Sequence, residues 1–232
     1  MQTVRDCWID PERLAPLAEA LNPYRPPGRD DPDWPHSTLS VRTVAYSCGA
    51  LRRAGDPVTH HHDPAELVLC ARLAADTAGT MEGTEIGMGN EGYGVFLPFF
   101  VAANADAPFG PELNADLIRR AFGGTIYPPA QVVVEPLDER GRWWQSVHDD
   151  YFAEEDDTDY GDLPRPDPLL GWRRMIQWFK TGSGLRQCSF VMIGETPLDP
   201  RHVNAGCIHP RLAVGLTAAG SLVGICGYVT HT

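Results

Sequence analysis

The residues with the clearest chemical potential lie near the C-terminal end of the sequence. His202, Cys207 and His209 are side chains of the kind that bind zinc, although a closed site needs a fourth ligand and no Cys-x-x-Cys pair accompanies them. A cysteine beside a positioned histidine could also act as a nucleophile. Cys188 and Cys226 lie in apolar strand patterns, which favour inert buried thiols. These residues support one enzyme hypothesis, a metal-dependent or thiol hydrolase.

Three other sequence motifs could form functional sites, but each also has a purely structural interpretation. Residues 60–63 read His-His-His-Asp, but adjacent residues point in different directions, so a solvated helix entry is favoured over a metal site. Residues 148–150, His-Asp-Asp, could serve as acid–base groups, and a solvated acidic loop explains them more simply. Residues 87–92 match G-x-G-x-x-G, yet the expected order is helix, loop, strand. A dinucleotide site needs the strand first, so a plain glycine loop is favoured.

The chain as a whole is acidic. It has 31 Asp and Glu against 19 Lys and Arg, a formal net charge of -12. This balance argues against direct nucleic-acid binding, because neutralising phosphates requires a basic patch. It suits a protein partner with a basic cleft. We expect the six cysteines to be reduced thiols, and the start lacks a secretory signal pattern, so a cytoplasmic location is expected.

An acidic segment interleaved with aromatic residues is the sharpest sign of a binding surface. It includes Asp156 and Asp157, and its aromatic members are Trp143, Trp144, Tyr151, Phe152 and Tyr160. Aromatic side chains among carboxylates are typical of a surface that binds a basic cleft. The alternative is a solvated loop with the aromatic side chains packed beneath it.

Hydrophobic periodicity predicts an α+β domain over residues 37–232, preceded by a helical arm and linker at residues 1–36. We expect an antiparallel sheet with helices packed on one side of it. Helix starts are predicted at Asp63, Asn114 and Asp167, with Glu66 reaching back to complete a capping box at the first of them. Strands are predicted at 38–46, 93–102, 131–135 and 188–193. The uncharged run 212–230 is broken at 218–220, which favours a buried hairpin over a membrane span.

The last nineteen residues, 214–232, resemble the closing segment of the nuclease A inhibitor family. The shared pattern consists of Gly215, Thr217, Ala219, Gly220, Leu222, Gly224, Ile225, Val229 and Thr232. Residues 191–197 also resemble the family's strand that ends in Gly-Glu-Thr-Pro. The two resembling segments cannot both fit one register, so residues from about 188 to 211 are either an insertion or a displaced copy. The order of elements agrees over roughly 64–232.

The resemblance implies a site as well as a fold. Members of the family shut off a sugar-non-specific nuclease, and a loop glutamate and the C-terminal threonine reach the magnesium site of that nuclease. Thr232 matches the threonine. Alignment on Tyr93 places Asn90 at the glutamate position and Glu91 one residue away. A carboxylate that enters a cationic cleft gains charge-assisted hydrogen bonds and excludes the phosphate it mimics.

These observations predict a bacterial protein-binding module, an inhibitor or immunity protein that blocks the active site of a nuclease or toxin. Its predicted partner-binding residues are Glu91, Asp156, Asp157 and Thr232, and it needs no cofactor or metal of its own. Two alternatives stay open: the hydrolase using the region of His202, Cys207 and His209, and a subunit of a larger complex that docks through the N-terminal arm.

Overall fold

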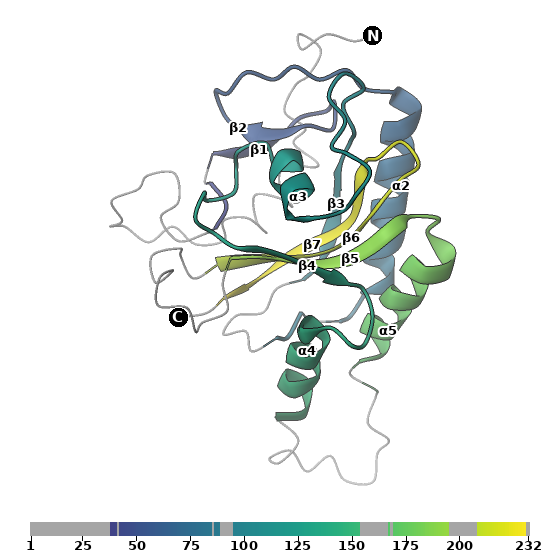
Figure 1. Cartoon of the computed structure of the whole chain (residues 1–232). Helices are drawn as coiled ribbons and strands as arrows, with labels where there is room; N and C mark the ends of the chain where they lie inside the picture. The colour runs from purple at the N-terminus through teal and green to yellow at the C-terminus, as the bar shows by residue number, and fades with distance from the viewer. Residues whose placement is uncertain are drawn as a thin grey trace.

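A computed structural model of the chain describes residues 38–40, 42–84, 86–88, 95–153, 167, 169–194 and 208–230, without the side chains of 151–153. The predicted arm at 1–36 lies outside these residues. Figure 1 shows a central five-stranded antiparallel sheet with the strand order β3-β7-β6-β5-β4. Its strands are β3 (Leu97–Val101), β4 (Val132–Pro136), β5 (Arg186–Ile193), β6 (Ile208–Leu216) and β7 (Leu222–Thr230).

The predicted terminal hairpin is confirmed as β6 and β7. Its register runs from Leu216↔Leu222 beside the turn to Ile208↔Thr230 at the open end. Gly220 has φ +89° in the turn, a conformation that glycine adopts without strain. A Cβ on Gly224 would lie 2.0 Å from the Ala213 carbonyl oxygen, so a side chain there would push the two strands apart. Backbone conformation therefore explains Gly220 of the family-like pattern, and close packing explains Gly224.

The helices are α2 (Pro64–Thr80), α3 (Ala115–Ala121), α4 (Arg142–Ala153) and α5 (Leu170–Gln177), and α5 continues into a π-helical turn, η3 (Trp178–Gly182). The predicted helix starts at Asp63 and Asn114 are confirmed, whereas α5 begins at Leu170, three residues after the predicted start at Asp167, and α4 was not predicted. Asp63 accepts a hydrogen bond from Ala65 N at 2.9 Å, and Asn114 accepts one from Leu117 N at 3.0 Å. The capping box is wrong, because the Glu66 carboxylate instead accepts from the Thr217 hydroxyl of the β6–β7 turn.

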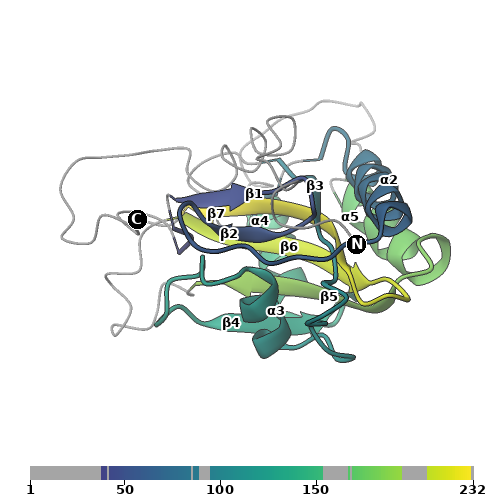
Figure 2. The ribbon, with the colours of Figure 1, turned by 90° about the horizontal axis from the view of Figure 1, so that it is seen from above.

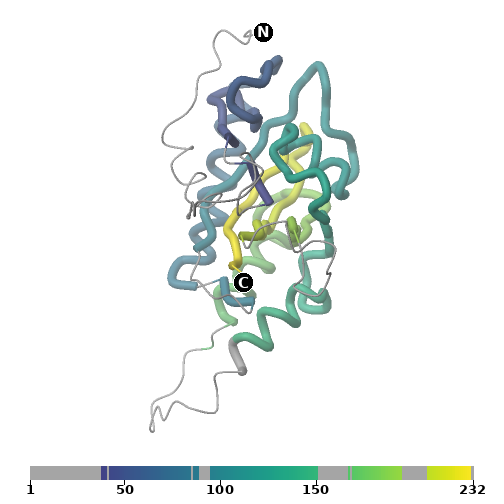
Figure 3. The backbone as a smooth tube through the Cα atoms, turned by 90° about the vertical axis from the view of Figure 1, so that its left-hand side faces the viewer, coloured from purple at the N-terminus to yellow at the C-terminus, as the bar shows by residue number. Residues whose placement is uncertain are grey.

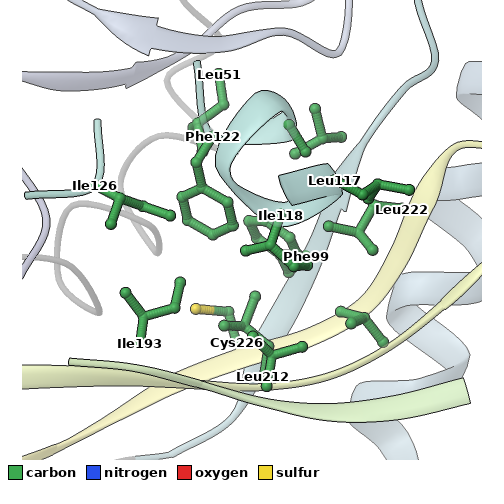
Figure 4. Close-up of a cluster of buried hydrophobic side chains, with 14 of the residues drawn as sticks. Leu51, Phe99, Leu117, Ile118, Phe122, Ile126, Ile193, Leu212, Leu222 and Cys226 are labelled. Carbon is green, nitrogen blue, oxygen red and sulfur yellow. The ribbon is translucent and has the colours of Figure 1, made fainter. Parts of the chain in front are cut away.

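One face of the sheet packs against α3. Leu117, Ile118 and Phe122 of that helix are fully buried with sheet residues that include Leu212 and Cys226. Figure 4 shows these side chains converging between the helix and the strands. Phe99 and Phe122 stack with ring centroids 5.6 Å apart. This contact fixes α3 over the sheet.

The opposite face packs against α2, α4 and α5, so the expectation of helices on one side only is wrong. Strand residues alternate between the faces, and Phe190, Ala213 and Ile225 point to the side that carries Trp143 of α4 and Trp172 of α5. Cys70 and Leu73 of α2 pack near Val223 on that side. Both faces of β6 are therefore covered, which is why all nine of its residues are buried and none alternates with solvent.

A second, two-stranded sheet was not anticipated. β1 (Thr43–Ala45) and β2 (Leu51–Arg53) pair antiparallel and bury Ala45 and Leu51 against the α3 face. Figure 2 shows this hairpin over β7 and β6, next to α3. In Figure 3 the hairpin lies above the sheet and α4 below it. None of the helices in the described part of the chain is long and apolar enough to cross a membrane.

Candidate partner-binding end of the sheet

The topology brings together two strand ends that adjoin predicted contact segments in the sequence. β3 and β7 are antiparallel neighbours with the register Leu97↔Cys226, so the chain enters β3 at the same end at which it leaves β7. We call this the tail end of the sheet. It is formed by the starts of β3, β4 and β6 and by the ends of β5 and β7, as Val132↔Ile193 and Ile208↔Thr230 show.

Glu91 and Thr232 themselves lie outside the described residues. In the sequence, each is six residues from a member of the pair Leu97↔Cys226. Val95 follows the segment 89–94, and its side chain is 60% exposed. Few large apolar side chains among the described residues are so exposed. The fold therefore places the start of β3 and the end of β7, the strand ends nearest in sequence to the two predicted contact residues, at one end of the sheet.

Asp156 and Asp157 also lie outside the described residues, and the described structure does not bring their segment to the tail end. They follow α4, which ends at Ala153. Figure 1 shows α4 leading away from the sheet on its lower side.

The aromatic part of the predicted binding surface is wrong for two residues. Trp143 is fully buried and Trp144 is 7% exposed, because α4 turns both toward the sheet. Trp143 stacks on Phe190 with centroids 4.5 Å apart and donates from Nε1 to the Pro136 carbonyl oxygen at 3.0 Å. Helical spacing of Trp143, Trp144 and Val147 was the signal that sequence reasoning missed. These aromatic side chains form core, as the alternative interpretation proposed.

Three buried polar residues occur at the tail end: Thr38, His209 and Arg211. Thr38 N donates to the Ile208 carbonyl oxygen at 3.1 Å and joins the segment before β1 to the start of β6. Gly194 closes the end of β5 with φ +87°, and a Cβ there would lie 2.4 Å from His209 Nδ1. Close packing therefore holds His209 inside the domain.

The hydrolase hypothesis gains little from the described residues. His202 and Cys207 lie outside them, and His209 is buried in β6. The described part of the chain contains no group of three or more His, Cys, Asp or Glu side chains that could hold a metal ion. Burial raises the pKa of the Cys188 thiol to about 11 and that of Cys226 to about 12. Such thiols have almost no thiolate at neutral pH, so neither is a ready nucleophile.

Cys48 corrects the expectation that all six cysteines are reduced, because it is disulfide-bonded. Cys70, Cys188 and Cys226 are free thiols. Disulfides persist mainly in oxidising compartments. This bond therefore weighs against the cytoplasmic location expected from the sequence.

The cysteines provide a direct test of this structure. Native protein treated with iodoacetamide at neutral pH should label Cys188 at least about 100-fold more slowly than unfolded protein, because its thiolate is scarce and partly buried. Cys226 should be slower still. Cys48 should label only after reduction. Peptide mass analysis of pulse-labelled samples measures all three rates, and rapid native labelling of Cys188 or of unreduced Cys48 would contradict the assignment.

The histidine run forms a packed, hydrogen-bonded loop before α2, whereas we expected a solvated helix entry. His60 is 1% exposed, and the segment is held by Asn104, whose Nδ2 donates to the Thr59 carbonyl oxygen at 2.9 Å. Asn104 Oδ1 accepts from His61 N at 3.2 Å. His61 Nδ1 contacts the Asp106 carboxylate. This cluster joins the entry of α2 to the chain after β3.

The glycine run agrees with its simpler interpretation as far as it is described, but residues 148–150 lie on helix α4 and not in the expected acidic loop. His148 and Asp149 lie on α4 with side chains 47% and 66% exposed and 3.7 Å apart. Gly87 and Met88 lie in a loop between α2 and β3, and residues 89–92 are outside the described part. The order helix, loop, strand is confirmed, which is unsuited to a dinucleotide site.

Comparison with known proteins adds no relative to this picture: no family model matches the chain, and a search of curated proteins gave no match. The resemblance of residues 214–232 to the nuclease A inhibitor family therefore stays a hypothesis.

Proposed function

We propose that this chain is a protein-binding module that inhibits a nuclease or toxin through the tail end of its sheet. In this proposal Glu91 and Thr232 contact the active site of the partner. Asp156 and Asp157 contribute to long-range attraction of a basic surface. The observation that supports the proposal is the pairing of β3 with β7, because β3 begins and β7 ends at the same end of the sheet and the two proposed contact residues adjoin these strand ends in sequence.

The surroundings of the tail end suit this role. Its strands are anchored by a core on both faces, so the two segments would be presented from a rigid support. The net charge of -12 would speed encounter with a basic partner and reject acidic ones. Burial raises the pKa of the Cys188 and Cys226 thiols, which favours binding over thiol chemistry at these residues. We also propose a bacterial cytoplasmic location. The Cys48 disulfide is an observation against this location.

Affinity capture followed by an activity assay tests the proposal. The baits are the intact chain and a chain that ends at Thr230, which lacks His231 and Thr232 and keeps β7 whole. The matched control is Ala219→Ser, an exposed position in the turn at the opposite end of the sheet. We expect the intact chain and the control to capture a nuclease and suppress its activity, and the shortened chain to lose both effects. Equal inhibition by all three baits, or capture of no nuclease by any, would contradict the proposal.

A further inference from the structure

The two outer strands of the five-stranded sheet differ in how their free edges are closed. At β3, Ala102 N donates to the Gly49 carbonyl oxygen at 3.1 Å, so the even-numbered residues of that strand face away from β7. Pro98 therefore faces the same side, where it offers no N–H. A proline and a covering loop are ordinary means by which proteins stop a sheet edge from pairing with another chain. β3 is thus a protected edge.

β4 lacks such protection along its middle residues. Gly194 N donates to the Gln131 carbonyl oxygen at 2.8 Å, so the odd-numbered residues of this segment face β5. By alternation, the backbone groups of Val132 and Val134 point away from the sheet. Their two N–H and two C=O groups have no hydrogen-bond partner in the described part of the chain. Figure 1 shows β4 at the front of the sheet, with α3 above it and α4 below.

Both ends of this open edge are closed by the chain itself. Before it, the Ala130 carbonyl oxygen accepts a hydrogen bond from the Arg119 guanidinium group. After it, Pro136 has no N–H, and its carbonyl oxygen accepts from Trp143 Nε1 at 3.0 Å. The stretch that can seat a further strand is therefore limited to residues 132–134.

The side chains of this stretch are apolar. Val132 and Val134 are half-buried and pack against the core under α3. Val133 points to the opposite face, where it is half-buried and belongs to none of the hydrophobic clusters among the described residues. Consecutive valines favour an extended strand. An apolar edge with no charge at its centre is the kind that pairs with another strand.

We propose that β4 pairs antiparallel with β4 of a second copy of this chain and joins the two five-stranded sheets into one. A two-fold axis beside Val133 would pair Val132 of each copy with Val134 of the other. This register uses all the free groups of both edges and makes four hydrogen bonds. A shift by one residue in either direction would set Val134 against Ala130 or Val132 against Pro136, whose groups are already used or absent. The edge is therefore complementary to itself in one register only.

Charges beside the edge favour a second copy as the occupant. Arg119 lies at the start of β4 and pairs with no carboxylate in the described part of the chain. Antiparallel pairing brings it near Asp138 of the second copy, just past the end of that strand. The exposed Gln131 would face Glu135 of the second copy, to which its amide could donate. The symmetry repeats both contacts. The net charge of -12 opposes the approach of two copies at long range, so the dimer should tighten as salt screens it.

Sedimentation of the full chain over a concentration series tests the pairing. We expect a monomer–dimer equilibrium with Kd of roughly 1 to 100 μM, typical of a small interface. Raising the salt from about 0.05 to 0.5 M should lower Kd. Val133→Lys should raise Kd at least about tenfold, because two ammonium groups would meet at the two-fold axis. Val133→Thr keeps the size and strand preference and should change Kd less than about threefold. Val68→Lys makes the same change at a 72% exposed position of α2 and should leave Kd unchanged.

Amide hydrogen exchange of the wild type keeps the proposal testable if Val133→Lys fails to fold. The amides of Val132 and Val134 should exchange at least about 100-fold more slowly above Kd than after dilution well below it. The amides of Val133 and Glu135 face β5 and should be protected at both concentrations, which makes them an internal control.

Four results would overturn the proposal. They are a chain that stays monomeric at about 1 mM, a Val133→Lys variant that dimerises like the wild type, a dimer that weakens as salt rises, and edge amides whose protection does not depend on concentration. In the last case the edge would be closed within one chain or left out of the dimer. The test contains no partner protein, so its failure is separate from that of the proposed inhibition.

Discussion

Replacing Trp143 by alanine is expected to lower the free energy of unfolding by about 3 to 5 kcal/mol, the range for buried tryptophans. Trp143 is fully buried, stacks on Phe190 and lies 5.8 Å from the ring of Trp172. Alanine would leave a large cavity between α4 and the sheet. It would also remove the N–H that the Pro136 carbonyl oxygen accepts. Urea denaturation followed by circular dichroism measures the loss.

A matched control on the same helix is Gln145→Ala, since Gln145 is exposed and bonds only to the exposed Asp149. It should change the free energy of unfolding by no more than about 0.5 kcal/mol. Trp143→Phe keeps most of the packing and should fall between the two. If Trp143→Ala proved as stable as the control, α4 would not be packed as the structure has it, and the acidic-aromatic segment would again be a candidate surface.

Local signals were sufficient to predict much of the fold. The hairpin of β6 and β7 follows from an uncharged run broken by Ala-Ala-Gly, and α5 follows from apolar residues at helical spacing from Trp172 to Phe179. Both patterns report contacts between near neighbours in sequence. The helix α4 was missed because its acidic residues obscured the apolar stripe that Trp143 and Val147 belong to.

Long-range features could not be predicted in the same way. The pairing of β3 with β7 joins residues more than a hundred positions apart, and it brings the start of one strand and the end of the other to the same end of the sheet. Arg211 gave no sequence signal of burial, since charged residues are rarely buried without a partner. The adjacent Pro210 within an apolar strand was the available clue. No cysteine-spacing motif in the sequence predicted the Cys48 disulfide.

The last prediction separates a local role of Glu91 from the general effect of negative charge. With a purified target, Glu91→Gln should raise Kd at least about 30-fold, the effect of losing a contact worth about 2 kcal/mol at an interface.

The matched control is Glu112→Gln, which removes the same charge at the opposite end of the sheet. Glu112 precedes Leu113, whose N donates to Gln187 Oε1 at 2.6 Å near the start of β5. It should change Kd less than about twofold, because an exposed distant charge is screened at physiological salt. Binding measured by calorimetry at two salt concentrations distinguishes the cases. Equal losses in both variants would mean that the net charge of -12, and not the tail end of the sheet, determines the affinity.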